Sequence, residues 1–167
     1  MPYNNYQKYN NSYSPKKPVK SFMDLEIYQQ ALAASVAVAN NLVNKEKSKK
    51  KKVEKPEEAV NLIKHNMLPC ALGIPHLIAE AHSYRFGSGT DCLVLLEKTM
   101  VNCNKMMVYL EQVRDICQTG QEHGFFEELI KKYSYIRRKT LNLQRVWKKY
   151  IEHPDGNFKS GFNKQPL

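Results

Sequence analysis

The sequence has no apolar run long enough to cross a membrane. A membrane-spanning helix needs about 20 predominantly apolar residues. The longest weakly apolar segment here is Ala31 to Ala39 (ALAASVAVA), and it follows the acidic residues Asp24 and Glu26. Neither its length nor its flanks fit a membrane span or a secretory signal. We interpret this segment as one face of a helix built from small side chains.

Cysteine is scarce as well, and its spacing excludes the usual structural roles. The sequence has no CxxC pair, and no cysteine has a histidine partner at zinc-finger spacing. A disulfide framework is typical of shorter, turn-rich secreted chains. We therefore expect a cytoplasmic protein with reduced cysteines in its core, namely Cys70, Cys92, Cys103 and Cys117.

Catalytic patterns are missing too. The sequence contains no Gly-rich phosphate loop, no nucleophile elbow and no His-Cys nucleophile arrangement. His76 and Glu80 are one helical turn apart and could share a metal, but His82 falls on another face, and the further carboxylates of a bundle di-metal site are lacking. We expect Glu80 to be hydrogen-bonded and to support the helix at Pro75 instead. The sequence predicts a non-enzymatic protein without cofactor or metal.

Helical periodicity, in contrast, covers most of the chain. Apolar residues recur at spacings of three and four over about 21–44, 56–86, 91–118 and 125–150, and no segment alternates as a strand does. Short or polar connections separate the four segments. The predicted fold is all-α, an up-and-down antiparallel four-helix bundle over 21–151 with a kinked second helix.

Local signals mark the first two helices. Ser21 and Asp24 form an S-x-x-D capping signal. The first helix then has a predicted inner face of Leu25, Tyr28, Leu32, Ala39 and Leu42. In the second helix, proline costs about 3 kcal/mol, so we expect packing to hold a buried kink at Pro75. The apolar stripe there ends in a basic residue and comprises Ala71, Ile74, Ile78, Ala81 and Arg85.

The third and fourth helices have longer apolar seams. In the third, the seam is Leu93, Leu96, Met100, Cys103, Met107 and Leu110, and a second row repeats every seven residues at Val94, Val101 and Val108. So wide an apolar surface predicts a helix in the middle of the bundle or at a subunit interface. In the fourth, the inner seam is Leu129, Tyr133, Ile136, Thr140, Leu143, Trp147 and Tyr150.

Three segments have no apolar periodicity. Residues 1–20 are rich in Asn, Tyr, Lys and Pro and predict a disordered basic tail, either solubilising or able to stack bases on its tyrosines. Residues 152–167 predict a second tail. The loop at about 45–56 is too charged to bury and offers a secondary basic site at Lys49, Lys50, Lys51 and Lys52.

The net charge of +10 is local. Residues 1–20 carry +4, residues 45–58 carry +3, and the segment from Lys131 to Lys149 carries +8 without one acidic residue. Ordinary surface helices mix signs and so avoid like-charge repulsion. We therefore predict a polyanion-binding face on the fourth helix. Its residues are Lys131, Lys132, Arg138, Lys139, Arg145, Lys148 and Lys149, and only Tyr135 interleaves an aromatic ring, so base reading is not implied.

Two segments resemble a known family. Phe22 to Ala31 (FMDLEIYQQA) resembles the opening F-x-D-L-x-V-W-Q-x-A of the four-helix bundle proteins encoded in intervening sequences of bacterial large-subunit ribosomal RNA genes. Gly73 to Ala81 (GIPHLIAEA) resembles their second signature, S-I-P-x-N-I-A-E-G, and supplies a structural motif at Ile74, Pro75, Ile78, Ala79 and Glu80. The chain looks like a diverged member, since it departs from both signatures at Tyr28, Gly73, Leu77 and Ala81.

A sister group with the same fold comprises the accessory variability determinants of diversity-generating retroelements, which are basic pentameric barrels that bind nucleic acid and a reverse transcriptase. The resemblance thus implies a homo-oligomer, a pentamer in that group, with RNA or DNA and a reverse transcriptase as partners. It leaves the ribosomal and the retroelement roles open. We expect a cytoplasmic accessory protein that binds structured RNA; the alternative is a scaffold whose basic face docks an acidic protein without binding nucleic acid.

Overall fold

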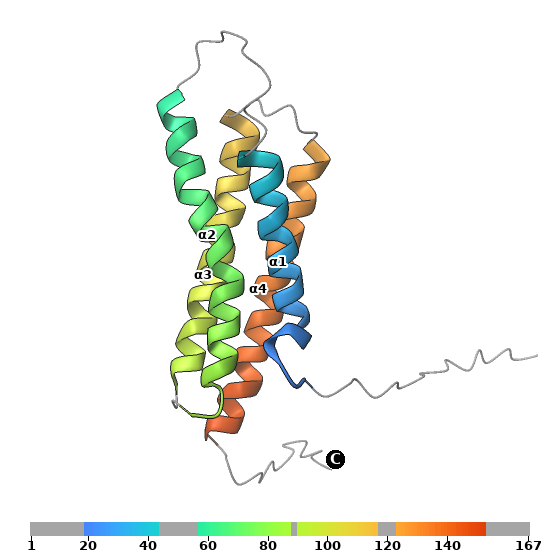
Figure 1. Ribbon diagram of the computed structural model, residues 1–167, viewed down its shortest axis with the longest axis vertical. Coiled ribbons are helices and arrows are strands. Elements are labelled where there is room, and N and C mark those ends of the chain that lie inside the picture. The colour runs from blue at the N-terminus through green and yellow to red at the C-terminus, as the bar shows by residue number, and fades with distance from the viewer. Residues whose placement is uncertain (1–18, 44–56, 88–89, 117–122, 153–167) are drawn as a thin grey trace, which may run out of the picture.

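The computed structural model describes residues 19–43, 57–87, 90–116 and 123–152, and within these ranges every regular element is helical. Four main helices pack closely side by side (Figure 1). This confirms the predicted all-α class with four packed helices. The elements in chain order are a 3-10 turn η1 (Phe22–Asp24), α1 (Glu26–Val38), a π-helical turn η2 (Ala39–Val43), α2 (Glu57–Tyr84), α3 (Asp91–Ile116) and α4 (His123–Glu152).

The four helices pack in a closed order. α2 lies between α1 and α3, α3 lies between α2 and α4, and α4 packs back against α1. Figure 1 shows the start of α1, the end of α2, the start of α3 and the end of α4 at one end of the molecule. Within the ranges given above, no helix has both the length and the apolar character needed to cross a membrane.

The capping signal before α1 is confirmed, but it caps a shorter element than expected. The Ser21 side chain accepts a hydrogen bond from the Met23 amide, and the Asp24 carboxylate accepts one from the Ser21 amide at 2.9 Å. The capped element is η1, because Leu25 has an extended backbone and α1 begins only at Glu26.

This interruption changes which side of α1 faces the core. The predicted inner position Leu32 is wrong, since its side chain is 45% exposed. An extended residue between two helical pieces resets the phase of the apolar stripe. The small-residue face is confirmed, because the buried residues of α1 are Ile27, Ala31, Ala34, Ser35 and Val38.

α2 continues unbroken through Pro69 and Pro75. Packing offsets the lost helix propensity, because the apolar residues of the predicted stripe are fully buried and Pro75 is buried beside them, while Arg85 at the end of the stripe is only half-buried. α2 approaches α3 at Gly73. A Cβ added there would lie 3.9 Å from the side-chain amide nitrogen of Asn102, which is an ordinary van der Waals distance. The buried part of the stripe is Ala71, Ile74, Ile78 and Ala81.

The seam of α4 is buried for most of its length. Leu129, Tyr133, Ile136 and Thr140 are buried, and Leu143 and Trp147 are half-buried. The predicted seam fails only at Tyr150, which is 62% exposed because it lies in the last turns of α4, where the bundle ends (Figure 1).

Three cysteines belong to the core as reduced thiols. Cys92 and Cys103 are buried and Cys70 is half-buried, and none of the three forms a disulfide with a described residue. Burial raises the pKa of Cys103 to about 12, so its thiol keeps its proton. The Cys70 thiol donates a hydrogen bond to the Asn102 carbonyl at 3.5 Å. Cys117 lies outside the described residues.

Candidate nucleic-acid interface

Four of the predicted cations form one outward stripe on α4. Residues seven apart on a helix lie almost above one another, and Lys131, Arg138 and Arg145 have this spacing, with Lys149 one turn beyond. All four side chains are exposed. They lie opposite the buried Tyr133, so core packing does not constrain them. At a rise of about 1.5 Å per residue, the stripe is about 27 Å long.

The other three predicted cations lie to the sides of this stripe. Lys132 and Lys139 are half-buried, and Lys139 approaches α1. Lys148 is exposed and forms an ion pair with Glu152 at 3.7 Å, within α4 itself. Among the described residues, no acidic side chain forms an ion pair with any of the four stripe residues. The seven predicted residues are therefore one stripe of four and three flanking cations.

Tyr135 and Glu26 tie the basic face of α4 to α1. The Tyr135 hydroxyl donates a hydrogen bond to one oxygen of the Glu26 carboxylate, and the Lys139 ammonium lies 3.7 Å from the other. Both neighbours raise the pKa of the Lys139 ammonium, Tyr135 more than Glu26, so Lys139 stays charged. The guanidinium carbon of Arg138 lies 5.7 Å from the centre of the Tyr135 ring, and the ammonium nitrogen of Lys139 lies 5.2 Å from it. Glu26 is 109 positions from Tyr135, so no local sequence pattern predicts this contact.

Arg137 was not among the predicted cations, and its position is different. Its side chain is half-buried, and its Nε is buried without a hydrogen-bond partner within the described part of the chain. The hydroxyl of Tyr133, four positions earlier in α4, is likewise buried without a hydrogen-bond partner among the described residues. Arg137 thus belongs to the edge of the core, and its omission from the predicted face is consistent with its burial.

The structure does not describe the second basic site or most of the two predicted tails. Lys49, Lys50, Lys51 and Lys52 fall in the range 44–56, for which the structure describes nothing, and the same holds for residues 1–18 and 153–167. Val19 and Lys20 are described and are exposed.

The structural motif in α2 is buried on one side only. Ile74, Pro75 and Ile78 are buried and Ala79 is half-buried. Glu80 is exposed and receives no hydrogen bond from any described residue, so its predicted support of the Pro75 region is wrong. A glutamate on the solvent side of α2 is hydrated and needs no protein donor.

The metal-ligating candidates do not converge. His76 and Glu80 are exposed, whereas His82 is buried, with its ring between those of Phe22 and Trp147. The residues that the structure describes contain no group of three or more side chains able to hold a metal ion.

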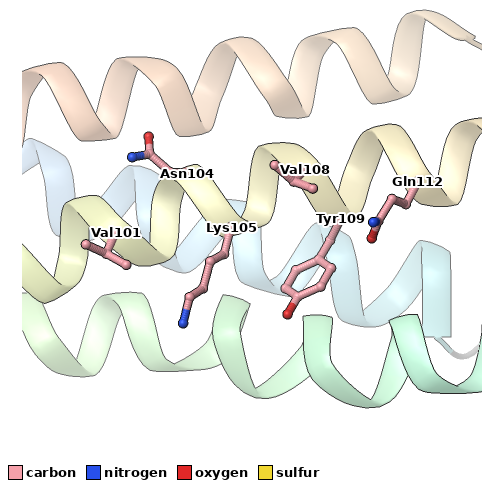
Figure 2. A pocket seen from close by; sticks show the side chains of 6 residues that line it. All are labelled: Val101, Asn104, Lys105, Val108, Tyr109 and Gln112. Atoms are coloured by element: carbon pink, nitrogen blue, oxygen red, sulfur yellow. The ribbon is translucent and has the colours of Figure 1, made fainter.

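The valine row of α3, which comprises Val94, Val101 and Val108, is on the outside of the bundle. The three side chains are 50%, 44% and 51% exposed. α3 packs on α2 and α4 but not on α1, so its predicted position in the middle of the bundle is wrong. A shallow groove of about 320 Å³ lies along this face. Figure 2 shows that its lining side chains all come from α3, between the ribbons of α2 and α4; they are Val101, Asn104, Lys105, Val108, Tyr109 and Gln112.

The chain matches no protein-family model, no curated protein and no solved structure among those compared. The resemblance to the intervening-sequence proteins and to the retroelement accessory proteins therefore stays a prediction from the two sequence motifs.

Proposed function

We propose that this chain is a non-enzymatic accessory protein that binds nucleic acid, structured RNA in the first place, through the outward stripe of α4. The observation that carries the proposal is the alignment of Lys131, Arg138, Arg145 and Lys149 on one exposed face. Four like charges on one side of a helix repel one another, and opposite charges in between would relieve the repulsion. A polyanion relieves it as well, and it releases bound counterions when it does so.

The shape of the stripe suits the backbone of a nucleic acid better than its bases. Flexible cationic side chains spread over about 27 Å contact phosphates one by one, at a rise of about 1.5 Å per helical residue. All four stripe residues are cations, and lysine and arginine supply many of the contacts that proteins make to phosphate oxygens. We therefore propose recognition by charge and shape, with strong dependence on salt.

The finer points of the fold belong to the same proposal. We propose an up-and-down antiparallel bundle, supported by the order in which helix ends meet in Figure 1, and a kink in α2 at the buried Pro75. A cytoplasmic location is supported by the reduced thiols of Cys70 and Cys103 in the core.

We also propose that the chain forms a homo-oligomer. The valine row supports it, because three half-exposed β-branched side chains on the outermost line of a helix are unfavourable in water. The pentameric state and a reverse-transcriptase partner are proposed only by resemblance to the retroelement proteins.

A titration with two matched pairs of substitutions tests the α4 stripe. We would measure filter binding of a structured RNA hairpin at several salt concentrations for the wild type, for Lys131→Gln with Lys149→Gln, and for Lys98→Gln with Lys105→Gln. Both pairs remove two exposed lysine charges, the first from α4 and the second from α3. We expect the first pair to weaken binding and to reduce the salt slope by between about 1.4 and 1.8. The second pair should have a much smaller effect.

Two outcomes would contradict the proposal. Equal losses for the two pairs would mean that only net charge matters and that α4 is not the contact surface. Wild-type protein that ignores RNA at low salt yet binds an acidic protein would identify the basic face as a protein-docking surface.

A further inference from the structure

The most exposed large apolar side chain of the described residues lies at one end of the bundle, directly after α2. Phe86 is 88% exposed. The guanidinium carbon of Arg85 lies over its ring, 4.2 Å from the ring centre. The two residues form a flat unit with a cation on one side of an aromatic ring, which we call the Arg85–Phe86 platform.

The core holds this platform in place. One terminal nitrogen of Arg85 donates a hydrogen bond to the carbonyl of His82 and lies 3.0 Å from Nδ1 of its ring. His82 is only 5% exposed, and its ring packs between Phe22 of η1 and Trp147 of α4. Arg85 is therefore positioned by a buried residue of α2 that packs against η1 and α4, although Phe86 itself is in solvent.

The surroundings leave the ring accessible. A Cβ added at Gly87 would meet no atom of the described residues within 4 Å, so none of them fills the space beside the platform. The contact between His82 and Trp147 brings the end of α2 to the level of the last turns of α4, where Arg145 and Lys149 are exposed. Figure 1 shows the ends of both helices at the same end of the molecule.

We propose that the Arg85–Phe86 platform stacks an unpaired base of the nucleic acid whose phosphates contact the α4 stripe. Aromatic rings and arginine planes are the two surfaces on which proteins stack unpaired bases, and every base offers a face for such a contact. A base in a duplex is already stacked on both sides and cannot reach the ring. The preferred ligand is thus RNA with a single-stranded loop or end. This proposal rests on the proposed function and adds a preference for unpaired nucleotides.

The test compares two RNA probes and three substitutions. The probes are a single-stranded oligoadenylate and a fully paired RNA duplex of the same length, both titrated at the same salt concentration. Phe86→Leu removes the ring but keeps an apolar side chain, Phe86→Trp keeps a ring, and Arg85→Lys keeps the charge without the planar guanidinium. Because Phe86 is exposed, these Phe86 variants should stay folded, which circular dichroism would verify.

We expect Phe86→Leu to weaken binding of the single strand by between about fivefold and a hundredfold, the effect of losing one base–aromatic stack. Binding of the duplex should be unchanged, and Phe86→Trp should keep the affinity for the single strand. Arg85→Lys should also weaken binding of the single strand.

Three results would overturn the proposal. Equal loss on both probes would show that Phe86 acts without stacking a base. No loss on either probe would mean that the exposed ring covers another surface, such as a second copy of the chain, while the function proposed for α4 would survive. Wild-type protein that binds neither probe would overturn both proposals, and the charge variants on α4 would then have no binding to reduce.

Discussion

The outer faces of α3 and α4 occupy equivalent places in the bundle but have opposite chemistry. The outermost line of α3 has three valines spaced by seven residues, and that of α4 has cations at the same spacing. Neither face contributes to the core, and each is unfavourable alone, the first by exposing apolar surface and the second by like-charge repulsion.

Folding of the bundle and the chemistry of its outer faces depend on different residues. A bundle needs only inner seams to fold, and the inner seams of α3 and α4 are similar, with fully buried Leu96 and Cys103 on one and Tyr133 and Ile136 on the other. An apolar line suits a protein partner, and a cationic line suits a polyanion. Under the function proposed above, the outer face of α3 would serve assembly and that of α4 would contact nucleic acid.

The largest expected effect concerns the inner seams and should be the same for both helices. Leu96→Ala and Ile136→Ala each remove a fully buried branched side chain. Each should lower the free energy of unfolding by about 2–5 kcal/mol, measured by urea denaturation. Val101→Ala and Lys131→Gln on the outer faces should change it by less than about 1 kcal/mol. A small effect of Leu96→Ala beside a large effect of Ile136→Ala would refute the equivalent packing of the two seams.

A second, smaller effect should appear with pH at the end of α2, where His82 packs against Trp147 of α4. Burial first, and then the Arg85 cation, lower the pKa of His82 below its usual value, while Asp24 acts in the opposite direction. The unfolded chain therefore binds the proton more readily than the folded one. The stability due to neutral His82 is complete above about pH 6.5 and is lost as the pH falls through the lower folded pKa.

The measurement is the urea midpoint of the wild type and of His82→Phe between pH 7.5 and 5. His82→Phe keeps an aromatic ring between Phe22 and Trp147 but cannot be protonated. The wild type should lose more stability on acidification than the variant. Parallel curves would show that His82 does not contribute to the pH dependence.

The third effect concerns the link between α1 and the basic face. Glu26→Gln removes the negative charge beside Lys139 and releases that lysine from its ion pair. RNA affinity at low salt should rise several-fold, and stability should change little because water screens this pair. Glu111→Gln on α3, also exposed, is the control with the same change of charge. If both variants gain equally, the ion pair with Lys139 has no local role in binding.

Periodicity predicted the helices well because each has an inner seam that repeats along the sequence. The stripe of α2 and most of the α4 seam are buried as predicted, and the four outward cations of α4 follow from the same spacing. The phase of α1 was missed because one extended residue, Leu25, interrupts the helical pattern, and propensity does not reveal such a break.

The parts of the candidate site that were missed depend on contacts between distant residues. Nothing near Lys139 in the sequence points to Glu26, and nothing near His82 points to Phe22 and Trp147, the rings that pack against it. The one available signal was the adjacency of a basic and an aromatic residue in Tyr84-Arg85-Phe86, which becomes informative only once the exposure of Phe86 is known.

The smallest expected effect tests the valine row of α3. Alanine has a higher helix propensity than valine by several tenths of a kcal/mol per residue. If solvent alone covers the row, changing Val94, Val101 and Val108 together to alanine should raise the free energy of unfolding by about 1 kcal/mol. If a second copy covers it, as we propose, the same change should lower the stability, and sedimentation should show a smaller species. The sign of the change in the free energy of unfolding distinguishes a row that faces solvent from one that a second copy covers. An exposed row gains helix propensity, whereas a covered row loses packing. Stabilisation with an unchanged sedimentation coefficient would exclude the valine row as the contact between copies.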